Sequence, residues 1–205
     1  MPKQQYQVDF LKSETTVLQL SDADIEYQIG FIEHSKALQL YQQLLDEIDW
    51  RQEVITVYGK QHPTPRLSCW MGEENLSYGY SQTRMQAVSW NQTVLDLKQQ
   101  IEQASGASFN SVLINYYRDG QDSNGWHSDD EPELGENPII ASLSLGAPRD
   151  FHLRHKQKPL KHKLTLENGS LLMMRGMTQH FWQHHIPKRA KALGRINLTF
   201  RTIKQ

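Results

Sequence analysis

Cysteine is almost absent from this sequence of 205 residues, and long apolar runs are absent altogether. The single cysteine, Cys69, excludes an internal disulfide and fits a reducing compartment such as the cytosol. No stretch approaches the roughly 18 consecutive apolar residues of a membrane span. The N-terminal segment MPKQQYQVDF also lacks the apolar core of a secretory signal peptide. We therefore expect a soluble, cytoplasmic protein that does not enter a membrane.

Acidic residues are scarce in one part of the chain. Residues 151–205 contain 12 Lys and Arg but a single acid, Glu167, a net charge of +11. Residues 1–150 contain 10 Lys and Arg against 22 Asp and Glu, a net charge of −12. A basic segment of this size suggests a polyanionic partner such as nucleic acid. The alternative is that the basic segment packs on the acidic half of the same domain.

The spacing of apolar residues predicts leading helices followed by many short strands. Helical spacing covers residues 34–49, with a cap near Ser35, and residues 92–104. Strands are predicted at 25–29, 54–57, 111–117, 139–145, 150–155, 163–166, 170–174, 181–185 and 195–203. This order predicts a single α+β domain, 1–205, with a sandwich or barrel of jelly-roll type and a loosely held arm at 1–22.

Two histidine-containing segments offer ligands for a metal. NGWHSDDE, residues 124–131, contains His127 and Asp129, and QHFWQHHIP, residues 179–187, adds His180, His184 and His185. Two histidines and one carboxylate form the facial arrangement of non-haem Fe(II) oxygenases, which leaves positions open for a cosubstrate and O2. The same donors also suit Zn(II) hydrolysis, so ligand type alone leaves the metal open.

A strand near the end of the chain favours an anionic cosubstrate. Period two places four polar side chains on one face of that strand: Arg195, Asn197, Thr199 and Arg201. Two guanidinium groups inside a β-barrel are costly to bury unless an anion pairs with them, and a dicarboxylic acid would suit both. Asn115 and Tyr117 share a face of another predicted strand and extend the same polar pattern. The alternatives are an edge strand with solvent-facing arginines, and a tyrosine that is only a core aromatic.

These stretches together resemble the AlkB family of Fe(II)/2-oxoglutarate-dependent dioxygenases, and most of all its DNA-repair branch with its bacterial relatives. The matching stretches occur in the family's order: VYGK (57–60), LSYGYS (76–81), LINYYRDG (113–120), WHSDDE (126–131), IASLSLGAPRDFHLRHK (140–156), GSLLMMRG (169–176), HFWQHHIPK (180–188) and RINLTFR (195–201). The resemblance implies a double-stranded β-helix, or jelly-roll, core at 109–203, with the N-terminal helices packed on it and a substrate-recognition region at 50–90.

The resemblance also implies roles for individual residues. His127, Asp129 and His184 match the iron ligands. Arg195 and Arg201 match the arginines that hold 2-oxoglutarate, with Arg201 on its distal carboxylate. Asn115, Tyr117, Asn197 and Thr199 match further parts of the cosubstrate pocket.

Three other residues match positions that contact the damaged base. Tyr80 matches an aromatic that stacks on the base, and Tyr58 matches a hairpin residue that fills the gap left by a flipped base. In the family members associated with this motif the hairpin position is Phe, so the hydroxyl of Tyr58 is a departure. Glu131 matches an acidic residue that favours cationic 1-methyladenine or 3-methylcytosine by Coulomb attraction. For all three, an ordinary surface or core role is the alternative.

The implied activity is oxidative demethylation of N-alkylated bases in nucleic acid, consuming O2 and 2-oxoglutarate and releasing succinate, CO2 and formaldehyde. The basic segment 152–163 would follow the phosphate backbone, and VYGK favours duplex DNA over RNA as the partner of a monomeric enzyme. Two alternatives stay open. One is a related oxygenase acting on RNA, protein, lipid or a small metabolite, and the other is a non-catalytic nucleic-acid-binding relative.

Overall fold

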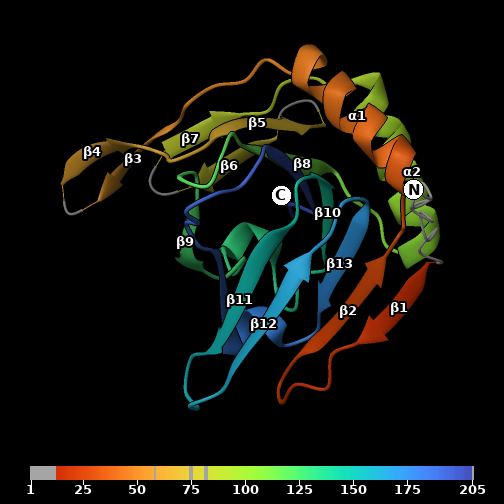
Figure 1. Ribbon diagram of the computed structural model, residues 1–205. Helices are drawn as coiled ribbons and strands as arrows, with labels where there is room; N and C mark the ends of the chain where they lie inside the picture. Colours follow the sequence, from red (N-terminus) through yellow and green to blue (C-terminus); the bar gives the residue numbers. More distant parts are fainter. Residues whose placement is uncertain (1–12, 58, 74–75, 81–82, 205) are drawn as a thin grey trace, which may run out of the picture.

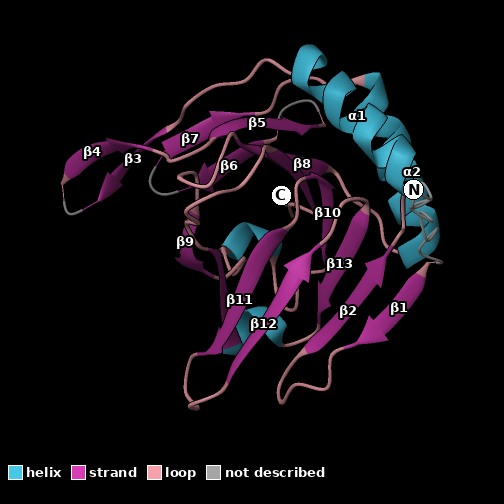
Figure 2. Ribbon diagram, viewed as in Figure 1, coloured by secondary structure: helices cyan, strands magenta, loops and turns pink. Residues whose placement is uncertain are grey.

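The computed structural model describes residues 13–57, 59–73, 76–80 and 83–204. Two antiparallel sheets face each other, and two helices cover the outer face of the larger sheet (Figure 1, Figure 2). The larger sheet has the order β1-β2-β13-β10-β15-β8-β5. Its strands are β1 (Glu14–Val17), β2 (Asp24–Ile29), β5 (Leu67–Gly72), β8 (Ser111–Tyr117), β10 (Ile140–Gly146), β13 (Ser170–Arg175) and β15 (Arg195–Arg201).

The smaller sheet has the order β12-β11-β14-β9. Its strands are β9 (Asn124–His127), β11 (Arg149–His155), β12 (Lys161–Leu166) and β14 (Trp182–Ile186). Two hairpins, β3 (Val54–Val57) with β4 (Lys60–Pro63) and β6 (Ser77–Tyr80) with β7 (Thr83–Gln86), form separate two-stranded sheets. The facing antiparallel sheets confirm the predicted jelly-roll type of α+β fold.

The two helices begin and end where local chemistry favours it. Helix α1 (His34–Glu47) is capped by Glu33, whose carboxylate accepts hydrogen bonds from the backbone N–H groups of Ser35 and Lys36 at 3.0 and 3.1 Å. The predicted cap near Ser35 is therefore wrong, because Ser35 lies inside the helix and its N–H is one of the groups being capped. Helix α2 (Gln92–Ser105) ends at Gly106, which takes a left-handed φ of 67°.

Other boundaries differ from the prediction at segments without a clear period. Strand β1 lies within the stretch predicted as an arm, and it pairs with β2 at the edge of the larger sheet. Strand β9 and the four-residue helix α3 (Thr178–Phe181) were not predicted, and neither was the short 3-10 helix η1 (Pro132–Leu134). These elements are too short to show a hydrophobic period, so their positions depend on tertiary contacts.

Two hydrophobic cores lie on opposite faces of the larger sheet. One packs that sheet against α1 and α2, and the other fills the space between the two sheets. Strand β15 contributes Ile196, Leu198 and Phe200 to the core beneath the helices. Because side chains alternate along a strand, its polar residues face the interior between the sheets. Among the described residues, no helix combines the length and apolar character needed to cross a lipid bilayer.

Candidate metal centre

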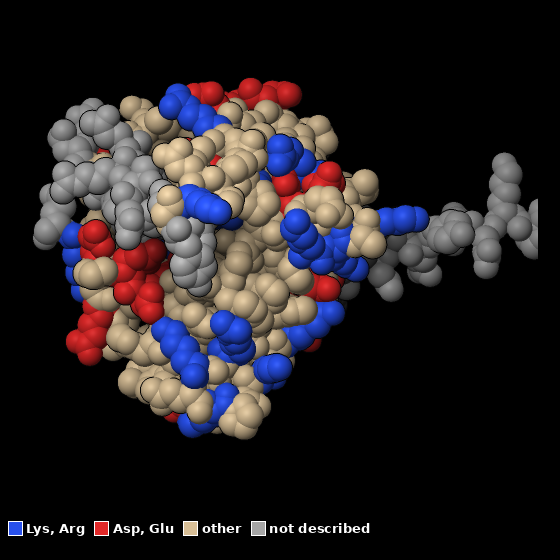
Figure 3. Space-filling model, turned by 90° about the vertical axis from the view of Figure 1, so that its left-hand side faces the viewer, with Lys and Arg blue, Asp and Glu red and all other residues tan. Residues whose placement is uncertain are grey.

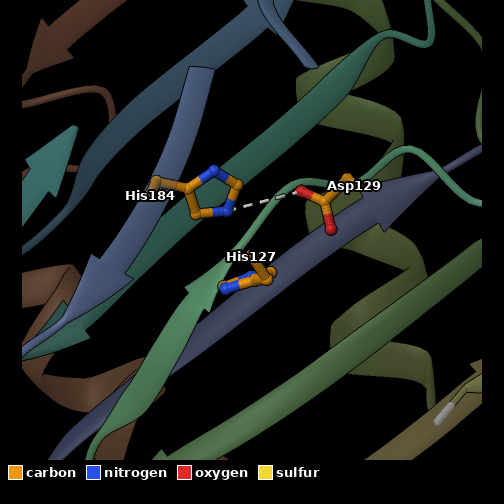
Figure 4. Close-up of side chains that lie close together, drawn as sticks. All are labelled: His127, Asp129 and His184. Carbon is orange, nitrogen blue, oxygen red and sulfur yellow. Dashed lines mark ion pairs between the residues drawn. The ribbon is translucent and has the colours of Figure 1, made fainter. Parts of the chain in front are cut away.

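Three potential metal ligands converge between the two sheets. His127 ends β9, Asp129 follows it by two residues, and His184 lies in the middle of β14 (Figure 4). One donor atom from each of the three lies within 4.8 Å of the other two. The pairing of β9 with β14 places His127 directly opposite His184, which explains how residues 57 positions apart meet. Ser128, between the two ligands of the first segment, instead donates to the Trp182 carbonyl at 2.9 Å.

The hydrogen bonding of His127 fixes which of its nitrogens is available. Its Nδ1 lies 2.8 Å from the carbonyl oxygen of Gly125. A carbonyl oxygen can only accept a hydrogen bond, so Nδ1 carries the proton, and Nε2 keeps a lone pair that faces the Asn124 side-chain amide at 3.4 Å. A metal-binding imidazole is commonly oriented by a hydrogen bond of this kind from its other nitrogen.

The electrostatics keep all three ligands in the form that binds a cation. Burial lowers the pKa of His184 to about 3, with His127 adding to the effect, so His184 is neutral at neutral pH. Burial also lowers the pKa of His127. Burial alone would raise the pKa of Asp129, but the charges of Arg201 and the two histidines lower it to about 2. A neutral histidine pair and an ionised carboxylate need to release no proton before they bind a metal.

Two buried arginines lie beside these ligands but have different partners. Arg201 donates from Nη2 to Asp129 Oδ1 at 2.5 Å, next to the metal ligands. Arg195, 1% exposed, donates from Nη2 to the Ser144 hydroxyl at 2.9 Å. The Nε and Nη1 atoms of Arg195 are buried without a hydrogen-bond partner among the described residues. Burial lowers the pKa of Arg195 to about 10, which reflects the cost of a buried cation without a counter-charge.

The inward face of β15 forms one wall of a single cavity that also contains the three ligands. The residues predicted to contact the cosubstrate all line it: Asn115, Tyr117, Arg195, Asn197, Thr199 and Arg201. The register of β8 with β15 places Tyr117 opposite Arg195 and Asn115 opposite Asn197. Because β15 is central in its sheet and its arginines are buried, the alternative of an edge strand with solvent-facing arginines is excluded.

Comparisons with known proteins agree with this geometry. Residues 24–201 match the sequence model of the 2OG-Fe(II) oxygenase superfamily. The chain is 37% identical over 192 residues to the human DNA oxidative demethylase ALKBH2, covering 88% of this chain and 73% of that protein. The chain belongs to the AlkB family of 2OG-Fe(II) oxygenases.

Other relatives share most of this chain but are longer. The alpha-ketoglutarate-dependent dioxygenase alkB homolog 3 is 44% identical in Bos taurus and 42% identical in Homo sapiens, each over 185 residues. Each alignment covers 85% of this chain but only 64% of the relative's own length. The solved structure of OsALKBH1 covers 91% of this chain and all of its own chain, with a TM-score of 0.66. At 17% sequence identity, that likeness supports the AlkB-like fold alone.

The donor set fits the Fe(II) of the 2OG-Fe(II) oxygenases. His127, Asp129 and His184 would hold Fe(II) through two neutral imidazoles and one carboxylate, a donor set that non-haem iron oxygenases use together with a cosubstrate and O2. A buried guanidinium with two unpartnered nitrogens in the same cavity fits a carboxylate-bearing cosubstrate such as 2-oxoglutarate. Both features come from this chain's own side chains.

Of the three residues predicted to contact the base, only Glu131 has a described side chain. Tyr58 lies outside the described residues, and so does the side chain of Tyr80, whose backbone ends β6. Glu131 is half-buried at the start of η1, two residues after Asp129. The other histidines of the second segment are not in the ligand group. His185 alternates with His184 along β14 and stacks on Trp126, and His180 is exposed in α3.

Three buried polar residues around the cavity were not predicted. Arg66 donates to the Asn115 side chain at 2.8 Å, and Gln179 accepts a hydrogen bond from the Asp129 N–H at 2.9 Å. Arg149, fully buried, donates to the carbonyls of Asp119, Asp122 and Pro187 and so joins two loops near the cavity. Their partners are distant in sequence, so no local pattern marks them.

The metal-free protein is expected to lose stability in mild acid because of His184. The folded pKa of about 3 lies below the ordinary value of 6.5, so between these values the unfolded chain binds a proton that the folded chain does not. The contribution of His184 to the free energy of unfolding is therefore fully present above about pH 6.5 and is lost as the pH is lowered toward 3. Denaturant unfolding of the metal-free protein from pH 7.5 to 4.5 would measure this.

The dependence of the free energy of unfolding on pH should become shallower in His184→Asn. It should not change in His62→Asn, which alters an exposed histidine of β4. An equal slope in all three proteins would contradict the assignment of His184 as a neutral buried imidazole.

Proposed function

We propose that this protein is an Fe(II)/2-oxoglutarate-dependent dioxygenase that demethylates N-alkylated bases in nucleic acid, with DNA as its substrate. The observation that carries the proposal is the buried group of His127, Asp129 and His184 in one cavity with the incompletely paired guanidinium of Arg195. The relatives named above as dioxygenases and DNA oxidative demethylases support the same activity.

The cosubstrate would span the cavity from the metal ligands to Arg195. Arg201 is already engaged by the metal ligand Asp129, whereas two nitrogens of Arg195 have no hydrogen-bond partner in the described part of the chain, and Arg195 lies opposite Tyr117. The distal carboxylate of 2-oxoglutarate therefore belongs on Arg195, and Arg201 stabilises the end near the metal. This reverses the order expected from the sequence, which put the distal carboxylate on Arg201. A zinc hydrolase would have no use for the guanidinium at Arg195.

Asn197 and Thr199 serve this pocket by different contacts. The Asn197 amide donates to the Ser142 hydroxyl and to the Leu143 carbonyl at 2.8 and 3.0 Å, and the Thr199 hydroxyl donates to Asn197 Oδ1 at 2.9 Å. These bonds fix the polar floor beneath the cosubstrate. We infer that the two residues shape the pocket and that Asn115 and Tyr117 contact the cosubstrate itself.

The reaction consumes O2 and 2-oxoglutarate. One oxygen atom enters the succinate formed on loss of CO2, and the other enters the N-methyl group, which leaves as formaldehyde and restores the N–H. Iron supplies the oxidation chemistry when it is bound. The protein contributes the buried ligand set and the arginines that hold the dicarboxylate. Phe151 and Leu166 add apolar walls to the cavity and exclude water from it.

The charge distribution favours a nucleic-acid substrate. Exposed lysines on and beside the β11–β12 hairpin (Lys158, Lys161 and Lys163) and on the segment after β14 (Lys188 and Lys191) would provide phosphate contacts. Figure 3 shows basic side chains below and to the right of the centre of one face, while acidic side chains gather at its left and also lie at its upper edge and beside the basic ones at the right. We infer that phosphates follow the basic side and that Tyr58, Tyr80 and Glu131 contact the base. A monomeric, cytoplasmic enzyme stays our prediction from the sequence.

Formaldehyde release from methylated oligonucleotides tests the proposed activity. Purified protein with Fe(II), 2-oxoglutarate and O2 should release formaldehyde from single- and double-stranded DNA that contains 1-methyladenine or 3-methylcytosine. Release should cease without 2-oxoglutarate or oxygen, and an unmethylated oligonucleotide of equal sequence is the control. RNA with the same bases should react more slowly. Succinate formation without formaldehyde from any methylated nucleic acid would contradict the proposal and favour an oxygenase of another substrate class.

A further inference from the structure

Gln179 is a buried glutamine whose side chain faces a proposed metal ligand. It lies in α3, between β13 and the ligand-bearing strand β14, and is 1% exposed. Its Oε1 accepts a hydrogen bond from the backbone N–H of Asp129 at 2.9 Å. Its Nε2 lies 3.5 Å from the Sδ atom of Met174, a residue that lines the cavity of the metal ligands. The side chain thus joins the backbone of one ligand to the wall of the site.

The backbone of Gln179 is itself held in place from outside the cavity. Lys156, just after β11, donates from Nζ to the Gln179 carbonyl oxygen at 2.8 Å and to Asp130 Oδ2 at 2.9 Å. The backbone N–H of Lys156 also donates to the Phe181 carbonyl at 2.7 Å. One ammonium group therefore bridges α3 and the residue that follows Asp129.

This bridge gives the otherwise unassigned Asp130 a partner. Asp129 and Asp130 follow β9, beyond the last residue that pairs with β14. Neither residue belongs to a strand or helix, so contacts other than a sheet ladder must fix their backbone. Gln179 holds the first residue and Lys156 the second.

The orientation of the Asp129 carboxylate depends on this support. Arg201 binds its Oδ1 at 2.5 Å, while Oδ2 lies 3.7 Å from Nε2 of His184. A charge-assisted bond to Arg201 would draw an unsupported aspartate away from the histidines. The hydrogen bond from the Asp129 N–H to Gln179 fixes the backbone, so that one carboxylate oxygen faces Arg201 and the other faces His184.

We propose that Gln179 is a positioning residue for the metal ligand Asp129, and that Lys156 supports it through its bridge to Asp130. The inference rests on the proposed metal centre, but it does not depend on the identity of the substrate. Groups that orient metal ligands typically contribute about 10–100-fold to metal affinity. Gln179 should contribute an effect of this size without touching the metal.

Metal binding by variants of the metal-free protein tests this role directly. Gln179→Met removes the acceptor at similar length and should weaken Mn(II) binding by about 10–100-fold. Gln179→Glu keeps an acceptor oxygen and should recover most of that loss. Gln28→Met changes a glutamine of β2 whose side chain donates to the Ser13 hydroxyl at the surface, so it is the matched control and should bind Mn(II) as the unchanged protein does. The visible spectrum of the Co(II)-loaded protein should shift in Gln179→Met alone.

A purely structural role would give a different result. Gln179→Met would then lower the Tm of the metal-free protein while leaving the Mn(II) affinity and the Co(II) spectrum unchanged, and that outcome would overturn the proposal. If Gln179→Met does not fold, Lys156→Met gives the second test, because the Lys156 side chain is partly exposed. It should weaken Mn(II) binding by a smaller factor, and unchanged binding would overturn the proposal.

The outcome is separable from the test of the proposed function. Unchanged protein that binds Mn(II) but releases no formaldehyde would refute the demethylase activity and leave the role of Gln179 intact. Unchanged protein that binds no divalent metal would refute the metal centre and this inference together.

Discussion

Asp129→Asn is expected to lower formaldehyde release by at least about 100-fold, because residues that only support metal ligands already contribute about 10–100-fold. The substitution keeps the shape of the side chain but removes the negative charge. It weakens one metal ligand and leaves the buried guanidinium of Arg201 without its counter-charge. Both effects act on the same site, so the loss of metal affinity should accompany the loss of turnover.

The measurement needs both kcat/KM and metal affinity, with a matched control. Asp49→Asn removes an aspartate whose side chain is 74% exposed and pairs with Arg51 on the surface, so it should leave both quantities unchanged. Added Fe(II) should restore little activity to Asp129→Asn, since the charge that pairs with the metal is gone. An Asp129→Asn protein that retains normal turnover at ordinary Fe(II) concentration would refute Asp129 as a metal ligand.

Arg195→Met is expected to raise the KM for 2-oxoglutarate by about 30-fold or more. This corresponds to the loss of about 2 kcal/mol or more when one partner of a buried charge pair is removed. Mn(II) affinity without cosubstrate should change little, because Arg195 donates to the Ser144 hydroxyl, whereas Arg201 is the arginine that binds Asp129. The expected effect is therefore confined to the cosubstrate.

Arg201→Met should behave differently, since Arg201 binds the ligand Asp129. It should lower the Mn(II) affinity as well as the affinity for 2-oxoglutarate. Arg195→Lys keeps the positive charge but lacks the forked geometry of a guanidinium. It provides a second test if Arg195→Met does not fold. Arg51→Met, at a surface arginine that is 67% exposed, is the control. A normal KM in both Arg195 variants, with a raised KM in Arg201→Met alone, would restore the order expected from the sequence.

The face of β15 was predictable because strand geometry is local. Alternation alone put Arg195 and Arg201 on one side, and the cost of burying them argued for an anion. The structure confirms that both are buried on that side. The sequence could not predict which of the two arginines would bind Asp129, because that contact depends on where the loop after β9 crosses the cavity.

Features that depend on contacts between distant segments escaped prediction. Gln179 lies next to histidines in the sequence, yet its partner Asp129 is 50 residues away. The bonds of Arg66 to Asn115 and of Arg149 to three carbonyls likewise join segments that no periodicity connects. The cap at Glu33 was missed for a simpler reason, since serine is the commoner capping residue and Ser35 stood two positions away.

The place of β15 in its sheet has a consequence for biosynthesis. It inserts between β8 and β10, although it follows the other described strands in the sequence. While the ribosome is still adding residues before 195, the larger sheet has no centre. At that stage neither Arg195 nor Arg201 is present beside His127 and Asp129. Closing the larger sheet requires β15 to pair with both β8 and β10, and long-range pairing of this kind is slow compared with local folding. Arg201 can reach Asp129 only once β15 has paired with β8 and β10, so the complete cavity forms together with that long-range pairing.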